Sequence, residues 1–136
     1  MEANALGFAL WNTRLAPHNL NQSFSGRHAG LVGSIIRDLI VGVNVRLLAL
    51  TEVRRVDVLS LLPETVRQTW QVVSDTSCEV HDFDVALAFD RSVCSLEWRE
   101  FLSLHHSGSR VRAGLLTCLR LLDGTFLVVV VAHWRS

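Results

Sequence analysis

The chain has 136 residues, and 49% of them are apolar, which suffices for one domain with a hydrophobic core and argues against an intrinsically disordered chain. Thirteen arginines balance thirteen acidic residues, and there is no lysine, so the net charge is zero. This balance argues against a protein that holds duplex DNA mainly through the charge of its phosphates.

The amino-terminal third has the pattern of a strand, a loop and a helix. The apolar run from Ala5 to Trp11 predicts a strand that ends at Asn12, and residues typical of a loop follow up to Gly26. Two sets of apolar residues then recur at three- and four-residue spacing between Arg27 and Val41, which predicts a helix that ends at Gly42. The sets are Leu31, Ile35 and Leu39, and Val32, Ile36 and Ile40.

A second strand is predicted from Val43 to Val53, with Thr51 and Glu52 at its polar end. A strand, a helix and a further strand form a unit whose right-handed crossover lays the two strands parallel. Parallel strands end at the same edge of a sheet. We therefore expect Asn12 and Glu52 to lie close together at that edge.

The middle of the chain is predicted to contain a helix and two strands. Pro63 marks a helix start, with Ser60 as a candidate cap, and the helix is expected to run to Val73. The run from Phe83 to Phe89 predicts a strand that ends in a polar turn. Residues 97–104 suit either a short helix or a bent strand, and we favour the strand because strands flank this segment.

The last part of the chain is predicted to be a β-hairpin. Asp123-Gly124 is a strong turn signal between the apolar segments 112–122 and 125–132. Within the second segment, the run from Phe126 to Val131 is dominated by β-branched valine, which predicts a strand covered on both faces. His133 is the polar side chain at the carboxyl end of this strand, where open α/β sheets usually hold their ligands.

Three strand ends thus present an amide, a carboxylate and an imidazole, those of Asn12, Glu52 and His133. Mg²⁺ prefers oxygen ligands, keeps several waters and binds through one or two carboxylates, so Glu52 with help from Asn12 is a candidate metal site. The imidazole of His133 is a candidate hydrogen-bond donor to charge that develops on a phosphoryl oxygen. Taken singly, Asn12 is more simply a turn residue and Glu52 a solvated strand end.

Four segments resemble motifs of the endonuclease/exonuclease/phosphatase superfamily, which has the deoxyribonuclease I-like fold, and they occur in the same order. The segments are Trp11-Asn12, residues 48–53, residues 83–89 and residues 130–136. The resemblance implies that Asn12 and Glu52 lie at a Mg²⁺ or Mn²⁺ ion and that His133 is a catalytic residue at the scissile phosphate. It also implies hydrolysis of phosphodiester or phosphomonoester bonds, with nucleic acid among the substrates of the family. Thr51 and Ala132 depart from the usual motif residues, and neither departure removes a catalytic group.

The resemblance covers only the amino-terminal half of the family's domain, so residues 1–136 are expected to form a single partial domain. The complete domain is a four-layer α/β (α+β) sandwich with mixed β-sheet. Its second half supplies Gly-Asp-Phe-Asn and Ser-Asp-His motifs, which do not occur in this sequence. We therefore expect a truncated phosphoesterase that is weakly active or inactive alone. The alternative is a non-catalytic interaction module or half of a split enzyme.

Half of a two-sheet sandwich is expected to leave the inner face of its sheet bare, which favours a homo-oligomer or a companion chain that covers it. Arg112 is a candidate substrate-binding residue, although a solvated strand end explains it more simply. His105-His106 are more simply a polar loop than metal ligands.

The three cysteines and the chain's amino terminus bear on the cellular compartment. The cysteines are odd in number and form no Cys-x-x-Cys pair, so we interpret them as buried thiols in a reducing cytoplasm. The sequence has no basic signal region and no uncharged stretch of membrane-spanning length, so we expect a cytoplasmic protein without a membrane span. The cysteines are Cys78, Cys94 and Cys118.

Overall fold

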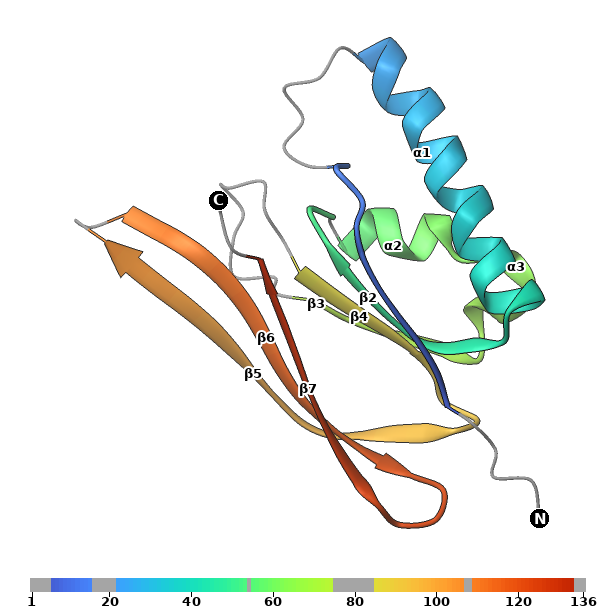
Figure 1. Ribbon diagram of the computed structural model, residues 1–136, viewed down its shortest axis with the longest axis vertical. Coiled ribbons are helices and arrows are strands. Elements are labelled where there is room, and N and C mark those ends of the chain that lie inside the picture. Colours follow the sequence, from blue (N-terminus) through green and yellow to red (C-terminus); the bar gives the residue numbers. More distant parts are fainter. Residues whose placement is uncertain (1–5, 16–21, 54, 75–84, 107–108, 134–136) are drawn as a thin grey trace.

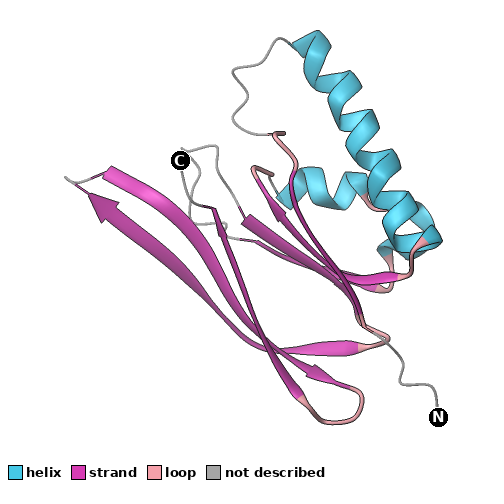
Figure 2. Ribbon diagram, in the orientation of Figure 1, coloured by secondary structure: helices cyan, strands magenta, loops and turns pink. Residues whose placement is uncertain are grey.

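The computed structural model describes residues 6–15, 22–53, 55–74, 85–106 and 109–133. Two β-sheets pack against each other, and helices cover the outer face of one of them (Figures 1 and 2). The layers are therefore a helical layer, a four-stranded sheet and a three-stranded sheet.

The four-stranded sheet is mixed, as the sequence predicted. Its strands are β1 (Gly7–Asn12), β2 (Val45–Thr51), β3 (Trp70–Ser74) and β4 (Val85–Asp90), in the spatial order β1-β2-β4-β3. The first two strands are parallel, whereas β4 pairs antiparallel with both of its neighbours. The predicted parallel pairing of the first two strands is thus confirmed. Phe83, the predicted start of the β4 strand, lies outside the described residues.

Helix α1 (Gln22–Arg37) continues into a π-helical turn, η1 (Asp38–Gly42), and the helical segment ends at Gly42 as predicted. It begins at Gln22, inside the segment that was predicted to be a loop. One of the two predicted apolar sets is fully buried against the sheet, and it consists of Val32, Ile36 and Ile40. In the other set, Leu31 is 58% exposed.

The helix predicted from Pro63 to Val73 is wrong over most of its length. The structure instead has α2 (Arg55–Leu61), the single turn α3 (Glu64–Arg67) and then strand β3. Trp70 and Val72 are buried on the helical side of the sheet and Val73 on the opposite side, so pairing with β4 buries both faces of this segment. Such burial favours β-branched and aromatic residues in a strand. Ser60 lies within α2, and α3 has no side-chain cap.

The second sheet is an antiparallel meander of β5 (Cys94–His106), β6 (Ser109–Leu121) and β7 (Phe126–His133). The strand favoured over a helix for residues 97–104 is confirmed, because this segment lies in β5. The predicted hairpin is confirmed too. Its turn uses Gly124 at φ 85°, a backbone conformation that suits glycine. The Asp123 carboxylate accepts a hydrogen bond from the Thr125 backbone N–H at 2.9 Å.

The second sheet covers the inner faces of β2 and β4, so the prediction of a bare inner sheet face is wrong there, whereas two apolar side chains on the same face of β1 are more than half exposed. Leu47 and Phe89 from the first sheet pack with Leu115, Leu119 and Val131 from the second, and all five are at most 1% exposed. These side chains form one apolar layer between β2, β4, β6 and β7.

The prediction that β7 is covered on both faces is also wrong. Val129 and Val131 face the core between the sheets, whereas the alternate residues lie on the outer face and are more than half exposed. The outer-face residues are Phe126, Val128 and Val130. A valine-rich run cannot distinguish one buried face from two, because both faces carry apolar residues. None of the helices in the described residues is long and apolar enough to cross a membrane.

The stability of this fold is expected to depend on pH through Asp90, at the end of β4. Its carboxylate lies 2.6 Å from Nη1 of Arg46 and accepts a hydrogen bond from the Ser92 N–H at 2.8 Å. Burial alone would raise the pKa of Asp90, but the bonds from Ser92 and Arg46 outweigh burial and lower this pKa. A lowered pKa stabilises the fold above the ordinary value for aspartate, about 3.9, and this stability is lost as the pH falls through the lowered pKa.

We therefore expect Asp90→Asn to be less stable than the wild type at neutral pH, with a difference that shrinks below about pH 4. Urea unfolding from pH 7 to pH 3 measures this difference. Asp38→Asn, at an exposed carboxylate, serves as the matched control. A loss of stability that stays constant over this pH range would contradict the expectation.

Candidate active site

Three strand ends from both sheets meet at one point. Asn12 ends β1, Glu52 follows β2, and His133 ends β7. Oε1 of Glu52 lies 3.1 Å from Nδ2 of Asn12 and 3.0 Å from Nε2 of His133. The side chains of Glu52 and His133 are 16% and 14% exposed, so the carboxylate and the imidazole sit in a partly closed site. The structure thus brings together the three residues that the sequence singled out, and their roles remain predictions.

The backbone around Glu52 is held by the segment that follows β1. The backbone N–H groups of Thr13 and Leu15 donate to the carbonyl oxygens of Thr51 and Glu52, both at 3.0 Å. The Thr13 hydroxyl is within hydrogen-bond distance of the same oxygens, at 3.2 Å from Thr51 and 2.9 Å from Glu52. Thr13 is 1% exposed. These bonds hold Glu52 in the left-handed region at φ 56°, a conformation that disfavours residues with a Cβ atom.

His28 on α1 supports the same segment from the helical side. Its Nε2 lies 2.6 Å from the carbonyl oxygen of Thr13. Sequence reasoning missed both residues, because neither Thr13 nor His28 belongs to a motif or breaks the local pattern. The one available signal was the position of Thr13 directly after the strand-ending Asn12.

The donors around Glu52 decide what the site can hold. Nδ2 of Asn12 donates a hydrogen bond to Oε1 of Glu52, and Nε2 of His133 lies 3.0 Å from the same oxygen. Oδ1 of Asn12 accepts a hydrogen bond from the backbone N–H of Arg14 at 3.1 Å. Asn12 therefore orients the carboxylate in this arrangement. The described residues contain no group of three or more His, Cys, Asp or Glu side chains that could hold a metal ion. A single carboxylate fits a cation such as Mg²⁺, which keeps most of its waters, better than it fits Zn²⁺.

The remaining candidate residues lie elsewhere or outside the described side chains. Arg112 lies in β6 opposite Leu104, and its side chain is outside the described part of the structure. The backbone of His105-His106 belongs to β5, so the predicted polar loop is wrong there. Cys94 and Cys118 are buried, as predicted, and burial raises the pKa of Cys94 to about 11. Cys78 lies outside the described residues.

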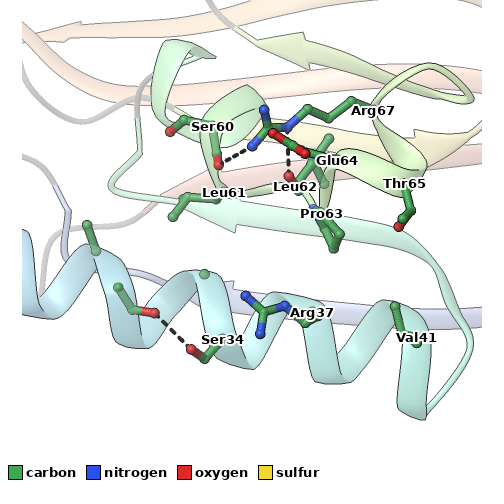
Figure 3. Close-up of a pocket in the computed structure, with 13 residues that line it drawn as sticks. Ser34, Arg37, Val41, Ser60, Leu61, Leu62, Pro63, Glu64, Thr65 and Arg67 are labelled. Carbon is green, nitrogen blue, oxygen red and sulfur yellow. Dashed lines mark hydrogen bonds between the residues drawn. The ribbon is translucent and has the colours of Figure 1, made fainter.

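A groove of about 530 Å³ lies on the helical side of the structure. Figure 3 shows α1 on one side of it and α2 with α3 on the other. Arg37 and Arg67 line the groove, and the Arg67 guanidinium donates to the carbonyl oxygens of Ser60 and Leu62 at 2.9 and 2.8 Å. None of the three candidate site residues lines this groove, so it is not part of the candidate site.

No protein-family model matches the sequence, and no curated protein matches it either. Solved structures do resemble the fold. The structure of D. rerio TDP2 complexed with single strand DNA product matches 96% of this chain and 46% of that chain, with a TM-score of 0.70 and 14% identity. The human Nocturnin catalytic domain with bound sulfate matches 96% of this chain and 50% of that chain, with a TM-score of 0.65 and 16% identity.

A mannosyl-6-phosphatase of Bacteroides thetaiotaomicron is also similar, over 95% of this chain and 51% of that chain, with a TM-score of 0.71 and 15% identity. The chain therefore spans about half the length of these similar structures. At such low identity the likeness concerns the fold, and it confirms the fold that the sequence predicted.

The strained backbone at Glu52 yields a test of how the site is built. Glycine in a strand is ordinarily less stable than alanine by about 0.5–1 kcal/mol. At φ 56° we expect the opposite order, because a left-handed conformation costs a residue with a Cβ atom about 1–2 kcal/mol. Glu52→Gly should thus be more stable than Glu52→Ala by about 1 kcal/mol in urea unfolding.

The same pair of substitutions at Glu100 serves as the control, since Glu100 is an exposed position in β5 without a positive φ. There the alanine variant should be the more stable one. An alanine variant that is more stable than the glycine variant at position 52 as well as at position 100 would contradict the left-handed conformation of Glu52.

Proposed function

We propose that this chain, which has the deoxyribonuclease I-like fold of the endonuclease/exonuclease/phosphatase superfamily, carries part of the active site of a Mg²⁺- or Mn²⁺-dependent phosphoesterase. The observation that carries the proposal is the meeting of Asn12, Glu52 and His133 at the ends of three strands from two sheets. An amide, a carboxylate and an imidazole in contact are suited to hold a hard cation next to a phosphate group.

Each of the three residues has a role in this proposal. Glu52 would hold the ion, and a bound Mg²⁺ or Mn²⁺ would supply Lewis-acid polarisation of a phosphoryl oxygen. Asn12 fixes one carboxylate oxygen of Glu52 through its Nδ2. His133 would be the catalytic residue, because its imidazole lies beside the carboxylate, with Nε2 3.0 Å from Oε1 of Glu52, and an imidazole N–H can stabilise negative charge that develops on a phosphate.

The substrate class is a phosphodiester or phosphomonoester, and nucleic acid is one candidate. In support, the similar D. rerio TDP2 was solved with a single-stranded DNA product, and another similar structure is a mannosyl-6-phosphatase. The molecule that carries the phosphate differs between these two similar proteins. The shared part is the phosphate ester, and Arg112 remains a candidate residue for binding it.

A second candidate is a non-catalytic interaction module or half of a split enzyme, which needs a homo-oligomer or a companion chain. The observation that favours it is the chain's span of about half the length of the similar structures, together with the lack of Gly-Asp-Phe-Asn and Ser-Asp-His motifs. Because the Ser-Asp-His motif, which supplies the water-activating groups of the family, does not occur in this sequence, the 136-residue chain should hydrolyse phosphodiesters poorly or not at all by itself.

We therefore expect this chain to bind a divalent cation without catalysing hydrolysis by itself. Calorimetric titration with Mn²⁺ should detect binding that Glu52→Gln weakens by at least about 10-fold, because even the loss of a residue that only orients a metal ligand typically costs about 10–100-fold. Glu64→Gln, at an exposed carboxylate on α3, is the matched control and should bind like the wild type. Hydrolysis of a generic phosphodiester should stay near background in all three proteins.

Two results would count against this account. Equal Mn²⁺ affinity in the wild type and Glu52→Gln would remove Glu52 as the metal residue. Robust Mg²⁺-dependent cleavage of plasmid DNA, abolished in Glu52→Ala and His133→Ala, would show that the chain is a complete enzyme by itself.

A further inference from the structure

His28 is a polar residue on the face of α1 and η1 that packs against the four-stranded sheet. It lies one turn before Val32, and Ile36 and Ile40 continue the same face at four-residue spacing. Val32, Ile36 and Ile40 are at most 5% exposed, whereas His28 is partly exposed. Figure 1 shows the amino-terminal end of α1 at the same end of the molecule as the ends of β1 and β2, where the candidate site lies. Of these four residues, His28 is therefore the one nearest the site.

The imidazole of His28 is bonded to the backbone of Thr13. Nε2 of His28 lies 2.6 Å from the carbonyl oxygen of Thr13. A carbonyl oxygen can only accept, so this nitrogen carries a proton and donates the hydrogen bond. A buried carbonyl oxygen without a partner costs free energy, and the imidazole N–H offsets that cost. His28 thus ties α1 to the residue that directly follows Asn12.

Thr13 is in turn bonded to the backbone of Glu52 and of the residue before it. Its N–H donates to the carbonyl oxygen of Thr51 at 3.0 Å, and its hydroxyl lies 2.9 Å from the carbonyl oxygen of Glu52. The N–H of Leu15 lies 3.3 Å from the same hydroxyl oxygen and 3.0 Å from the carbonyl oxygen of Glu52. The φ of Glu52, 56°, is a left-handed conformation that persists only where the surroundings hold it. The segment that His28 fixes is therefore the one that holds Glu52.

We propose that His28 is a positioning residue, which acts through Thr13 on the carboxylate of Glu52. Without the bond from His28, Thr13 loses its tie to α1, and the backbone of Glu52 loses a constraint on its left-handed conformation. The carboxylate then leaves the point where Nδ2 of Asn12 and Nε2 of His133 lie 3.1 and 3.0 Å from its Oε1. The inference rests on the proposed function in one respect, namely that the displaced carboxylate would bind a divalent cation more weakly.

Two substitutions at His28 separate its hydrogen bond from its bulk. The amide nitrogen of glutamine is as many bonds from Cβ as Nε2 of histidine, so His28→Gln keeps a donor in reach of the Thr13 carbonyl oxygen. Leucine fills space at the same position and has no donor. His28→Leu should therefore show the loss of the bond, and His28→Gln should reverse that loss.

Calorimetric titration of the full chain with Mn²⁺ measures the effect on the metal site. We expect His28→Leu to weaken Mn²⁺ binding by about 10-fold, the lower end of the range typical of residues that orient a metal ligand. His28→Gln should bind like the wild type. Ile36→Val is the matched control, because it removes a buried methylene group from the same face of α1 away from the site. It should lower the stability in urea unfolding and leave Mn²⁺ affinity unchanged.

Amide hydrogen exchange of the metal-free protein measures the position of Glu52 without any ion. The N–H groups of Thr13 and Leu15 donate to carbonyl oxygens at and just after the end of β2, so their exchange reports this contact. Both should exchange faster in His28→Leu than in the wild type and return to the wild-type rate in His28→Gln. In Ile36→Val both should keep the wild-type rate, because groups at strand ends exchange by local opening.

Unchanged Mn²⁺ affinity in His28→Leu, when Glu52→Gln does weaken binding, would overturn the positioning role and leave the proposed function intact. An equal loss of affinity in His28→Leu and Ile36→Val would also overturn it, since both would then act through stability alone. A wild type that binds no Mn²⁺ would overturn the metal site, and the exchange rates would then decide whether His28 positions Glu52. If His28→Leu fails to fold, His28→Asn replaces it, because its amide is one bond shorter.

Discussion

The apolar contact between the two sheets is the interaction on which the candidate site depends. His133 belongs to the three-stranded sheet and Glu52 follows a strand of the four-stranded sheet, so only the packing of the sheets brings them within 3.0 Å. Phe89 and Leu115, both without exposed surface, are part of that contact. Each sheet could form its own backbone hydrogen bonds without the other. The site exists because alternate residues of both sheets are apolar on the faces that meet.

A second constraint acts on the backbone at Glu52. The left-handed conformation costs free energy, and the structure offsets this cost with the backbone bonds of Thr13 and Leu15 to the ends of β2. The carboxylate is thereby aimed at the end of β7 rather than along its own strand. Strain of this kind persists where the surroundings determine the conformation, and it is common at functional sites.

The elements with a clear period could be predicted from the sequence, namely the parallel pair β1 and β2, the helix between them and the hairpin at Asp123-Gly124. The candidate site followed from three strand ends. The segment β3 could not be predicted, because its burial depends on pairing with β4, and short apolar runs fit a helix as well as a strand. The supporting roles of Thr13 and His28 arise from tertiary hydrogen bonds, which leave no pattern in the sequence. The exposure of the outer face of β7 could not be predicted either, because it depends on which elements pack against that face.

The central claim is that a divalent cation binds at Glu52, next to Asn12 and His133. Amide NMR spectra of the chain during addition of Mn²⁺ test it most directly, because the paramagnetic ion broadens the signals of nearby groups. We expect broadening to begin at residues 12–13, 51–53 and 133, including the side-chain amide of Asn12. Broadening centred on the groove between α1 and α2, or no selective broadening at all, would contradict it.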